Sequence, residues 1–419
     1  MTADSKLSAA TLVTRLGRDP ARQNHAVNPP VYHASTLAFD SVAEFEAAAA
    51  AKFDKGALFY GRYGMPTTFA LESAVAELEG GYGAIAMSTG LAAITCTLLT
   101  FLRAGDQVLV TDTVYEPTRR VCGQLLGRFG IEVSYFDPLI GAGIAELIRP
   151  NTRLIYLESP GSLTFEVQDV PAIAAAAHRA GLVVLCDNTW ASPLYFKPFA
   201  HGVDVSIQAA TKYIVGHADA MLGMIVSREE HYEALRRTAI DLGHAAAPDD
   251  VYLALRGLRT LALRMARHHQ SAIEVATWLR DRPEVARVLY PALPGDPGHA
   301  LWRRDFTGAS GLFGVALAPR PKEAVTAMLD GLELFSIGVS WGGFESLVRP
   351  TSVAGNRTAT LWEPPGPLLR FHIGLEDPRD LIADLEAGFA RLSRSAPSQA
   401  PAQAPVQAPA QTARERGIS

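Results

Sequence analysis

The stretch TRLIYLESPGSLTFEVQDVPAIAAAAHRAGLVVLCDN, residues 152–188, decides the fold class. It begins with TRLIYLES and ends with LVVLCDN, short apolar β-branched runs that are typical of buried strands. Residues 169–181 between them predict a helix, because Asp169 suits an N-cap, Pro171 lies in the first turn and Gly181 is a C-terminal stop. This order of elements predicts a βαβ unit and hence a parallel sheet.

The same alternation continues over the first two thirds of the chain. Helices are predicted at 67–79 and 90–102, and further strands at 84–89, 106–112, 131–137 and 204–210. We therefore expect an α/β fold with a mostly parallel central sheet flanked by helices. Residues 249–283 predict one long helical segment, either straight or bent. Short strands with a final helix near 378–394 predict a smaller C-terminal α+β domain. The Ala/Pro/Gln-rich tail at 395–419 is predicted to be disordered.

Composition excludes several classes of protein. The 419 residues carry a net charge of −5 without basic blocks, so no nucleic acid or membrane partner is expected. The longest apolar run, at 90–102, is too short to span a bilayer, and the N-terminus lacks the pattern of a secretory signal. The three cysteines, Cys96, Cys122 and Cys186, are scattered and indicate a reducing compartment. The expected location is the cytoplasm.

Two side chains with chemical potential follow predicted strands. Asp187 ends the strand of LVVLCDN, and Lys212 follows the strand at 204–210. Since ligands bind outside the carboxyl ends of parallel strands, an amine and a carboxylate are expected at one sheet edge. The residue types alone leave alternatives open, because a strand-end aspartate also suits a turn and a lone lysine is often solvated. Residues 88–90 form either an anion-binding helix start or a plain capped turn.

Two further motifs carry less weight. GYGAIA at 81–86 fits G-x-G-x-x-A, but a helix precedes it and a strand follows, which reverses the dinucleotide-binding arrangement. His268 and His269 lie in one predicted helix with no third ligand at useful spacing, so no metal site is expected.

Many segments, in their order and spacing, resemble the Cys/Met-metabolism family of pyridoxal-phosphate enzymes of fold type I. They include FYGRYGMPT, VYEPT, LESPGS, DNTWAS, SIQAATKYIVGHADAM, SWGGFESL and RFHIGLED. The resemblance spans about 28–394 and is strongest with bacterial β-lyases. It implies a pyridoxal 5′-phosphate cofactor and the aspartate-aminotransferase-like fold of these transferases. It also implies an N-terminal arm at 1–60, a large cofactor-binding domain at 61–255 and the C-terminal domain at 256–394.

The resemblance assigns roles around the cofactor. Lys212 resembles the catalytic lysine that bonds to the cofactor, and Asp187 resembles the carboxylate that pairs with its pyridinium nitrogen, which favours the charged ring. Tyr115, in VYEPT, resembles a catalytic tyrosine stacked on the ring. Gly90 and Leu91 resemble the residues whose backbone N–H groups bind the phosphate.

Other matched residues complete the implied site. The hydroxyl of Thr211 is implied to bind phosphate as well. Tyr60 and Arg62 resemble a pair that reaches the phosphate from the neighbouring subunit, with Tyr60 also facing the substrate. An arginine suits this task because its fork matches phosphate oxygens. Arg370 resembles the arginine that binds the substrate α-carboxylate. A homo-oligomer is therefore implied, a homotetramer with active sites shared across a dimer.

The segment SWGGFESL bears on the reaction. β-Lyases resemble this segment with a tryptophan at the place of Trp341, which would line the pocket, and Ser340 would help to hold the substrate carboxylate. The implied reaction is α,β-elimination of a thioether amino acid: L-cystathionine would give homocysteine, pyruvate and ammonia in methionine biosynthesis. Cystine and other cysteine S-conjugates are further implied substrates.

Two alternatives remain. One is a γ-directed relative, namely a cystathionine γ-lyase, a methionine γ-lyase or a cystathionine γ-synthase, and the other is a cofactor-binding regulatory protein. Two residues also depart from the family pattern: Ala209 replaces a phosphate-binding serine found in many members, and Ile240 replaces an aromatic residue near the substrate entrance.

Overall fold

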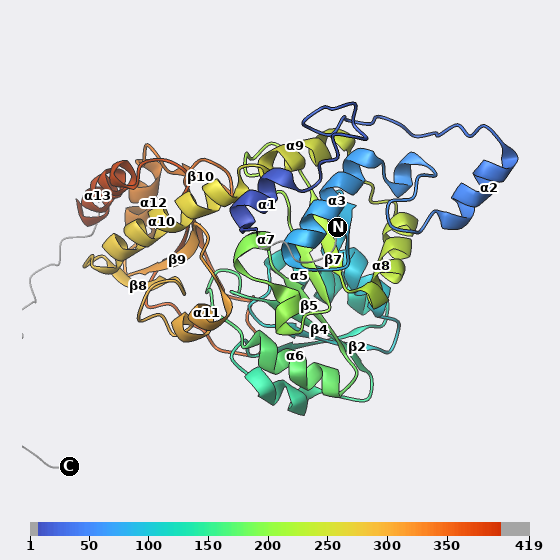
Figure 1. Cartoon of the computed structure of the whole chain (residues 1–419). Helices are drawn as coiled ribbons and strands as arrows, with labels where there is room; N and C mark the ends of the chain where they lie inside the picture. The colour runs from blue at the N-terminus through green and yellow to red at the C-terminus, as the bar shows by residue number, and fades with distance from the viewer. Residues whose placement is uncertain (1–6, 395–419) are drawn as a thin grey trace, which may run out of the picture.

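The computed structural model describes residues 7–394. The tail predicted to be disordered, 395–419, lies outside these residues. Two sheets organise the described chain, one in a large N-terminal part and one in a smaller C-terminal part (Figure 1). Among the helices of residues 7–394, none is long and apolar enough to cross a membrane.

The larger sheet has seven strands in the order β1-β7-β6-β5-β4-β2-β3. They are β1 (Gly83–Met87), β2 (Gln107–Thr111), β3 (Glu132–Phe136), β4 (Thr152–Glu158), β5 (Val183–Asp187), β6 (Val205–Gln208) and β7 (Gly223–Ser227). Strands β3, β2, β4, β5 and β6 are parallel, whereas β7 is antiparallel to both β6 and β1. The predicted mostly parallel sheet is confirmed. Strand β7 was not predicted, because its β-branched run is only Ile225–Val226.

Helices cover both faces of this sheet, and successive strand residues alternate between the two faces. On β2, Leu109 packs into the core that includes α6 (Val170–Arg179). Its neighbours Val108 and Val110 pack into the core that includes α4 (Gly90–Phe101). A strand that is buried on both sides shows no polar alternation, which explains its continuous apolar sequence.

The predicted helix signals around this sheet are confirmed. The predicted helix at 67–79 is α3 (Pro66–Glu79). The side chain of Asp169 caps α6 by accepting a hydrogen bond from the N–H of Ala172 at 3.3 Å. Further helices of the large part include α5 (Glu116–Arg120), α7 (Ser192–Tyr195) and α8 (Glu229–Leu242).

The N-terminal segment contains two helices with different surroundings. Helix α1 (Ala9–Arg15) packs through Val13, which is 1% exposed. Helix α2 (Val42–Ala51) has no buried residue, and Figure 1 shows it at the end of an extended chain, apart from the main body.

The helical segment predicted at 249–283, for which a bend was allowed, is divided into two helices. The chain forms α9 (Pro248–Leu258) and α10 (Leu261–Arg280), with a break between them. Gly257 lies so close to the loop after Lys212 that an added Cβ would be 2.3 Å from the Val215 carbonyl oxygen. The Gly257 carbonyl accepts a hydrogen bond from the Arg264 side chain at 2.8 Å. The N–H of Thr260 donates to the same carbonyl oxygen at 3.1 Å, so the carbonyl at the end of α9 is bonded where the chain turns.

The C-terminal part has a five-stranded sheet in the order β10-β11-β12-β9-β8. Its strands are β8 (Val285–Leu289), β9 (Leu312–Leu317), β10 (Ser336–Ile337), β11 (Leu347–Thr351) and β12 (Leu368–His372). Its helices are α10, α11 (His299–Asp305), α12 (Lys322–Asp330) and α13 (Pro378–Arg394). One hydrophobic core joins the two parts, since Ile173 of α6, Ala272 of α10 and Phe313 of β9 all belong to it.

Candidate active site

Lys212 lies in the turn after β6, in contact with the C-terminal part. Its Nζ donates a hydrogen bond to Ser340 Oγ at 2.7 Å and lies 5.2 Å from the centre of the Trp341 ring. Burial and the positive charge of Arg370 together lower the pKa of Lys212 to about 8, against the opposing negative charge of Asp187. Such a lysine is about one tenth neutral at pH 7, far more than an ordinary lysine, which suits a nucleophile or a base.

Asp187 occupies the carboxyl end of β5 and is 8% exposed. Its Oδ1 accepts hydrogen bonds from the N–H and hydroxyl of Thr189 at 3.0 and 2.5 Å. Burial raises the pKa of Asp187, while these bonds and the charge of Lys212 work in the opposite direction. The structure therefore brings the carboxylate and the amine to one sheet edge, as the strand order requires. Thr189 was missed, although its position two residues after Asp187 is typical of a turn that satisfies a carboxylate.

The segment around Gly90 begins helix α4. Thr89 is the N-cap, and its Oγ1 accepts from the N–H of Ala92 at 3.0 Å. Gly90 packs on the chain before Lys212: an added Cβ would lie 2.7 Å from Cβ of Ala209. The N-terminal end of α4 and the lysine turn are therefore neighbours, and helix N-termini favour anions. Leu91 follows Gly90 in the first turn of α4.

Thr211 also lies in this turn, but its hydroxyl has backbone partners. Oγ1 accepts from the N–H of Leu222 at 2.8 Å and lies 3.1 Å from the Leu222 carbonyl oxygen, to which it donates. Within this chain the hydroxyl links the lysine turn to the segment before β7.

Tyr115 follows β2 and is the N-cap residue of α5, with 41% of its surface exposed. Its N–H donates to Oε2 of Glu158 at 2.7 Å. Burial raises the pKa of Tyr115, and the charges of Glu158 and Asp187 raise it further. Glu158, at the carboxyl end of β4, was missed by sequence reasoning, and its place at the end of a buried strand was the available signal.

The C-terminal part contributes Arg370, from the middle of β12. Its Nη2 donates to the carbonyl oxygens of Val339 and Ser340, the latter at 3.1 Å. Burial and the neighbouring positive charge of Arg349 together lower the pKa of Arg370 to about 10. Arg370 therefore holds the turn that presents Ser340 and Trp341 to Lys212.

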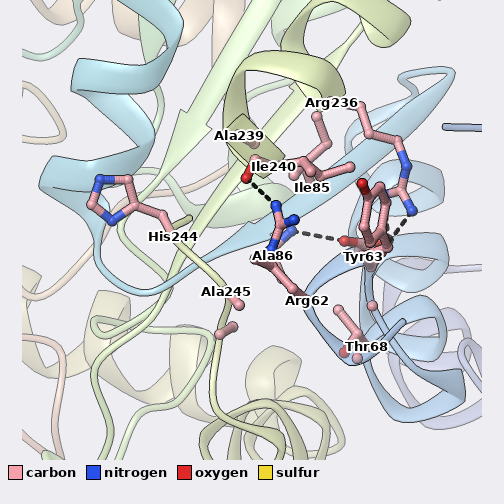
Figure 2. A pocket seen from close by; sticks show the side chains of 14 residues that line it. Arg62, Tyr63, Thr68, Ile85, Ala86, Arg236, Ala239, Ile240, His244 and Ala245 are labelled. Carbon is pink, nitrogen blue, oxygen red and sulfur yellow. Dashed lines mark hydrogen bonds and ion pairs between the residues drawn. The ribbon is translucent and has the colours of Figure 1, made fainter. Parts of the chain in front are cut away.

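Tyr60 and Arg62 do not join this group within one chain. Arg62 Nη1 donates to the Ile240 carbonyl oxygen at 2.6 Å, in the pocket of Figure 2. That pocket is also lined by His244 and Arg236, and by none of the residues around Lys212. Tyr60, next to this segment, is 39% exposed. Ile240 is buried and lines the same pocket as Arg62, so within one chain it lies beside the Arg62 turn.

The residues around Lys212 fit pyridoxal phosphate by their chemistry. The amine suits the cofactor aldehyde, the buried carboxylate of Asp187 suits a protonated ring nitrogen, and the N-terminal end of α4 suits a phosphate. Tyr115 offers an exposed aromatic ring at the same edge of the sheet.

The chain belongs to the family of Cys/Met metabolism PLP-dependent enzymes, which it matches over residues 10–390. The cystathionine beta-lyase MetC of Escherichia coli is 47% identical over 93% of this chain and 100% of its own length. The cystathionine beta-lyase of Salmonella typhimurium is 46% identical over 91% of this chain and 98% of its own length. Relatives of 40% and 38% identity are an L-alanine/L-glutamate racemase of Wolbachia pipientis and an L-methionine gamma-lyase of Pseudomonas deceptionensis.

Solved structures agree with this assignment. A cystathionine gamma synthase from Xanthomonas oryzae, in complex with aminoacrylate and cysteine, has a TM-score of 0.85 at 32% identity, covering 93% of this chain and 100% of its own. The predicted fold is confirmed. The protein is a pyridoxal-phosphate-dependent carbon–sulfur lyase that acts on small molecules.

The lowered pKa of Lys212 predicts selective chemistry of its amine in the cofactor-free enzyme. Because the neutral amine fraction rises as pH increases through about 8, acetic anhydride at pH 8 should acetylate Lys212 on the order of tenfold faster than the exposed Lys322. Peptide mass spectrometry measures both rates, and added cofactor should protect Lys212. A slower reaction of Lys212 than of Lys322 from pH 7 to 10 would contradict the assignment.

Proposed function

We propose that this enzyme is a cystathionine β-lyase, which cleaves L-cystathionine to homocysteine, pyruvate and ammonia. The observation that carries the proposal is the position of Trp341, whose ring centre lies 5.2 Å from Nζ of Lys212. A rigid indole at this place narrows the space beside the reacting lysine, as the resemblance to β-lyases implies. The relatives named cystathionine beta-lyase at 46–47% identity support the same reaction.

Lys212 is the proposed general base. Pyridoxal phosphate, when bound, makes the substrate Cα proton acidic by withdrawing electrons. Nζ of Lys212 takes that proton, and its pKa of about 8 allows it to accept and return a proton near neutral pH. The hydrogen bond to Ser340 Oγ orients Nζ. The same Nζ–H is the proposed donor to the departing thiolate.

Arg370 and Ser340 are the proposed partners of the substrate carboxylate. Arg370 is positively charged at neutral pH even with its pKa lowered to about 10, and a guanidinium matches a carboxylate with two parallel hydrogen bonds. Asp187 and Tyr115 are proposed to hold the cofactor ring, and Gly90, Leu91 and Thr211 its phosphate.

Tyr60 and Arg62 are proposed to act in the site of a second copy. Within one chain Arg62 bonds to Ile240 and lines a different pocket from the Lys212 group. Helix α2, which precedes them, has no buried residue in the single chain. In a homotetramer built from dimers with shared sites, Tyr60 and Arg62 would enter the partner's site and α2 would pack on another copy. The three cysteines are buried and unpaired, which agrees with the proposed cytoplasmic role in methionine synthesis.

Product analysis tests the reaction. The enzyme with cofactor is incubated with L-cystathionine, and the keto acid is identified by mass spectrometry. Pyruvate with homocysteine is the expected result. Formation of 2-oxobutyrate with cysteine would reject β-elimination in favour of γ-elimination. Incubation with L-alanine and chiral analysis is the control for racemase activity, where no D-alanine is expected.

A further inference from the structure

A short segment of the C-terminal part, residues 357–360, packs against the large part, and we call this segment the latch. It lies between β11 and β12 and contacts Asp112, the residue after β2. The N–H groups of Thr358, Ala359 and Thr360 donate to the Asp112 carboxylate at 2.9, 3.0 and 2.9 Å. Three successive amides on one carboxylate form an anion-binding nest, here filled by a side chain of the same protein.

Two arginines complete the contact. Arg357 Nε lies 3.2 Å from Asp112 Oδ2, and its Nη1 reaches Glu166 Oε1 at 3.0 Å. Arg119 binds the other oxygen of Asp112 at 3.1 Å. The Asp112 side chain is fully buried and that of Arg357 is 8% exposed. Burial alone would raise the pKa of Asp112, but the hydrogen bonds from the latch amides, the Thr360 hydroxyl and Arg119 together outweigh it and keep the pKa below the usual value. The charged Asp112 carboxylate therefore binds the latch to the large part.

The large-part side of this contact carries Tyr115. The N–H of Arg119 donates to the Tyr115 carbonyl oxygen at 3.0 Å, and the Arg119 guanidinium returns to Asp112. Tyr115 thus lies in a loop whose two ends are joined by the Asp112–Arg119 ion pair. Asp112 is therefore linked to Tyr115 through the Arg119 ion pair and one backbone hydrogen bond.

The C-terminal side of the contact leads to Arg370. The chain runs from the latch into β12, which carries Arg370, and Arg370 bonds to the turn of Ser340. Arg370 lies near enough to Tyr115 for its positive charge to oppose the rise in the Tyr115 pKa that burial causes. The latch therefore connects the Tyr115 side of the site to the Arg370 side.

We propose that Asp112 and Arg357 are positioning residues, which fix the distance between Tyr115 and the substrate-binding turn held by Arg370. The inference rests on the proposed function in one respect, because it takes Arg370 as the partner of the substrate carboxylate. Loosening the latch then weakens substrate binding while Lys212 and its chemistry stay intact.

The chain offers a matched control. Arg304 of α11 also links the C-terminal part to the large part, bonding to Asp169 at 2.8 Å. Its other partner is Asp305. Neither carboxylate contacts Tyr115, Lys212 or Arg370 through a hydrogen bond or ion pair in residues 7–394. Arg304→Met removes an ion pair between the two parts without touching the site.

The first test is steady-state kinetics of the enzyme with cofactor, using L-cystathionine and, separately, L-cystine. Arg357→Met and Asp112→Asn should each raise KM about tenfold while kcat stays within about threefold. Arg304→Met should change both by less than about twofold. The KM of the double variant Asp112→Asn/Arg357→Met should be about the same as that of the more impaired single variant, because both substitutions disrupt the same contact. Equal effects of Arg357→Met and Arg304→Met on KM would overturn the proposal.

The second test is independent of turnover. Hydrogen exchange measured by mass spectrometry should become faster at 357–360 and at 113–118 in Asp112→Asn and Arg357→Met, and not in Arg304→Met. Faster exchange in the latch alone, with 113–118 and KM unchanged, would overturn the positioning role. If the wild type cleaves neither substrate, the proposed function fails, while the exchange at 113–118 still decides whether the latch holds Tyr115. If the others fail to fold, Thr360→Val is the next variant, because it keeps both charges and removes only a hydroxyl, which donates to Asp112 at 3.0 Å and accepts from Arg357 Nε at 2.9 Å.

Discussion

Lys212→Ala is expected to lower kcat with L-cystathionine on the order of 10⁴-fold, because it removes both the covalent partner of the cofactor and the proposed general base. The yellow absorption of the bound cofactor should be lost with it. The substitution removes one side chain whose Nζ bonds to Ser340, so the fold should persist. Absorption spectroscopy and the pyruvate assay measure the two effects.

Lys197 provides the matched control for this experiment. It is also a lysine whose pKa is lowered by burial, but its Nζ donates to the carbonyl oxygens of Leu78 and Pro193. Lys197→Met should therefore reduce the melting temperature and leave the absorption band in place. Exogenous methylamine should restore part of the activity of Lys212→Ala and none of that lost in the Lys197 variant. A Lys212→Ala enzyme that keeps its absorption band would refute the assignment of the lysine.

Asp187→Asn is expected to lower kcat about 10²- to 10³-fold and to weaken cofactor binding. The reason is that it removes the negative charge of the buried carboxylate that is proposed to pair with the protonated ring nitrogen of the cofactor. Asparagine keeps the shape and can still accept the Thr189 N–H bond, which is 3.0 Å long in the parent. The loss therefore reports the charge and not the packing. Kinetics and titration of the cofactor-free enzyme, followed by tryptophan fluorescence, give the two quantities.

The control carboxylate is Asp204, at the opposite end of the sheet. It precedes β6, is 6% exposed, and bonds to the N–H of Val184 and to His178. Asp204→Asn should lower the free energy of unfolding by about 1–3 kcal/mol, because the buried asparagine amide cannot satisfy all the partners of the carboxylate. The affinity for the cofactor should be unchanged. If Asp204→Asn weakens the cofactor as much as Asp187→Asn, the ring-pairing role of Asp187 is refuted.

The site itself was only partly accessible from sequence. Lys212 and Asp187 were expected at one sheet edge because both follow strands of a parallel sheet, and this needs no knowledge of distant partners. Ser340 reaches Lys212 from 128 residues away, and Arg357 reaches Asp112 from 245 residues away. Such contacts leave no periodic signal, so Ser340 entered only through the resemblance and the latch did not enter at all.

By itself the sequence determined the local elements and the fold class. Strand runs such as 182–188 and the capped helix after Asp169 depend on residues that are near in sequence. At that range helix and strand propensity, capping residues and Gly or Pro stop signals act. Only the tertiary structure decided the antiparallel insertion of β7, the break between α9 and α10, and the placing of Arg370 against the turn of Ser340. These features arise from packing and hydrogen bonds between distant segments, which override local preference once the core has formed.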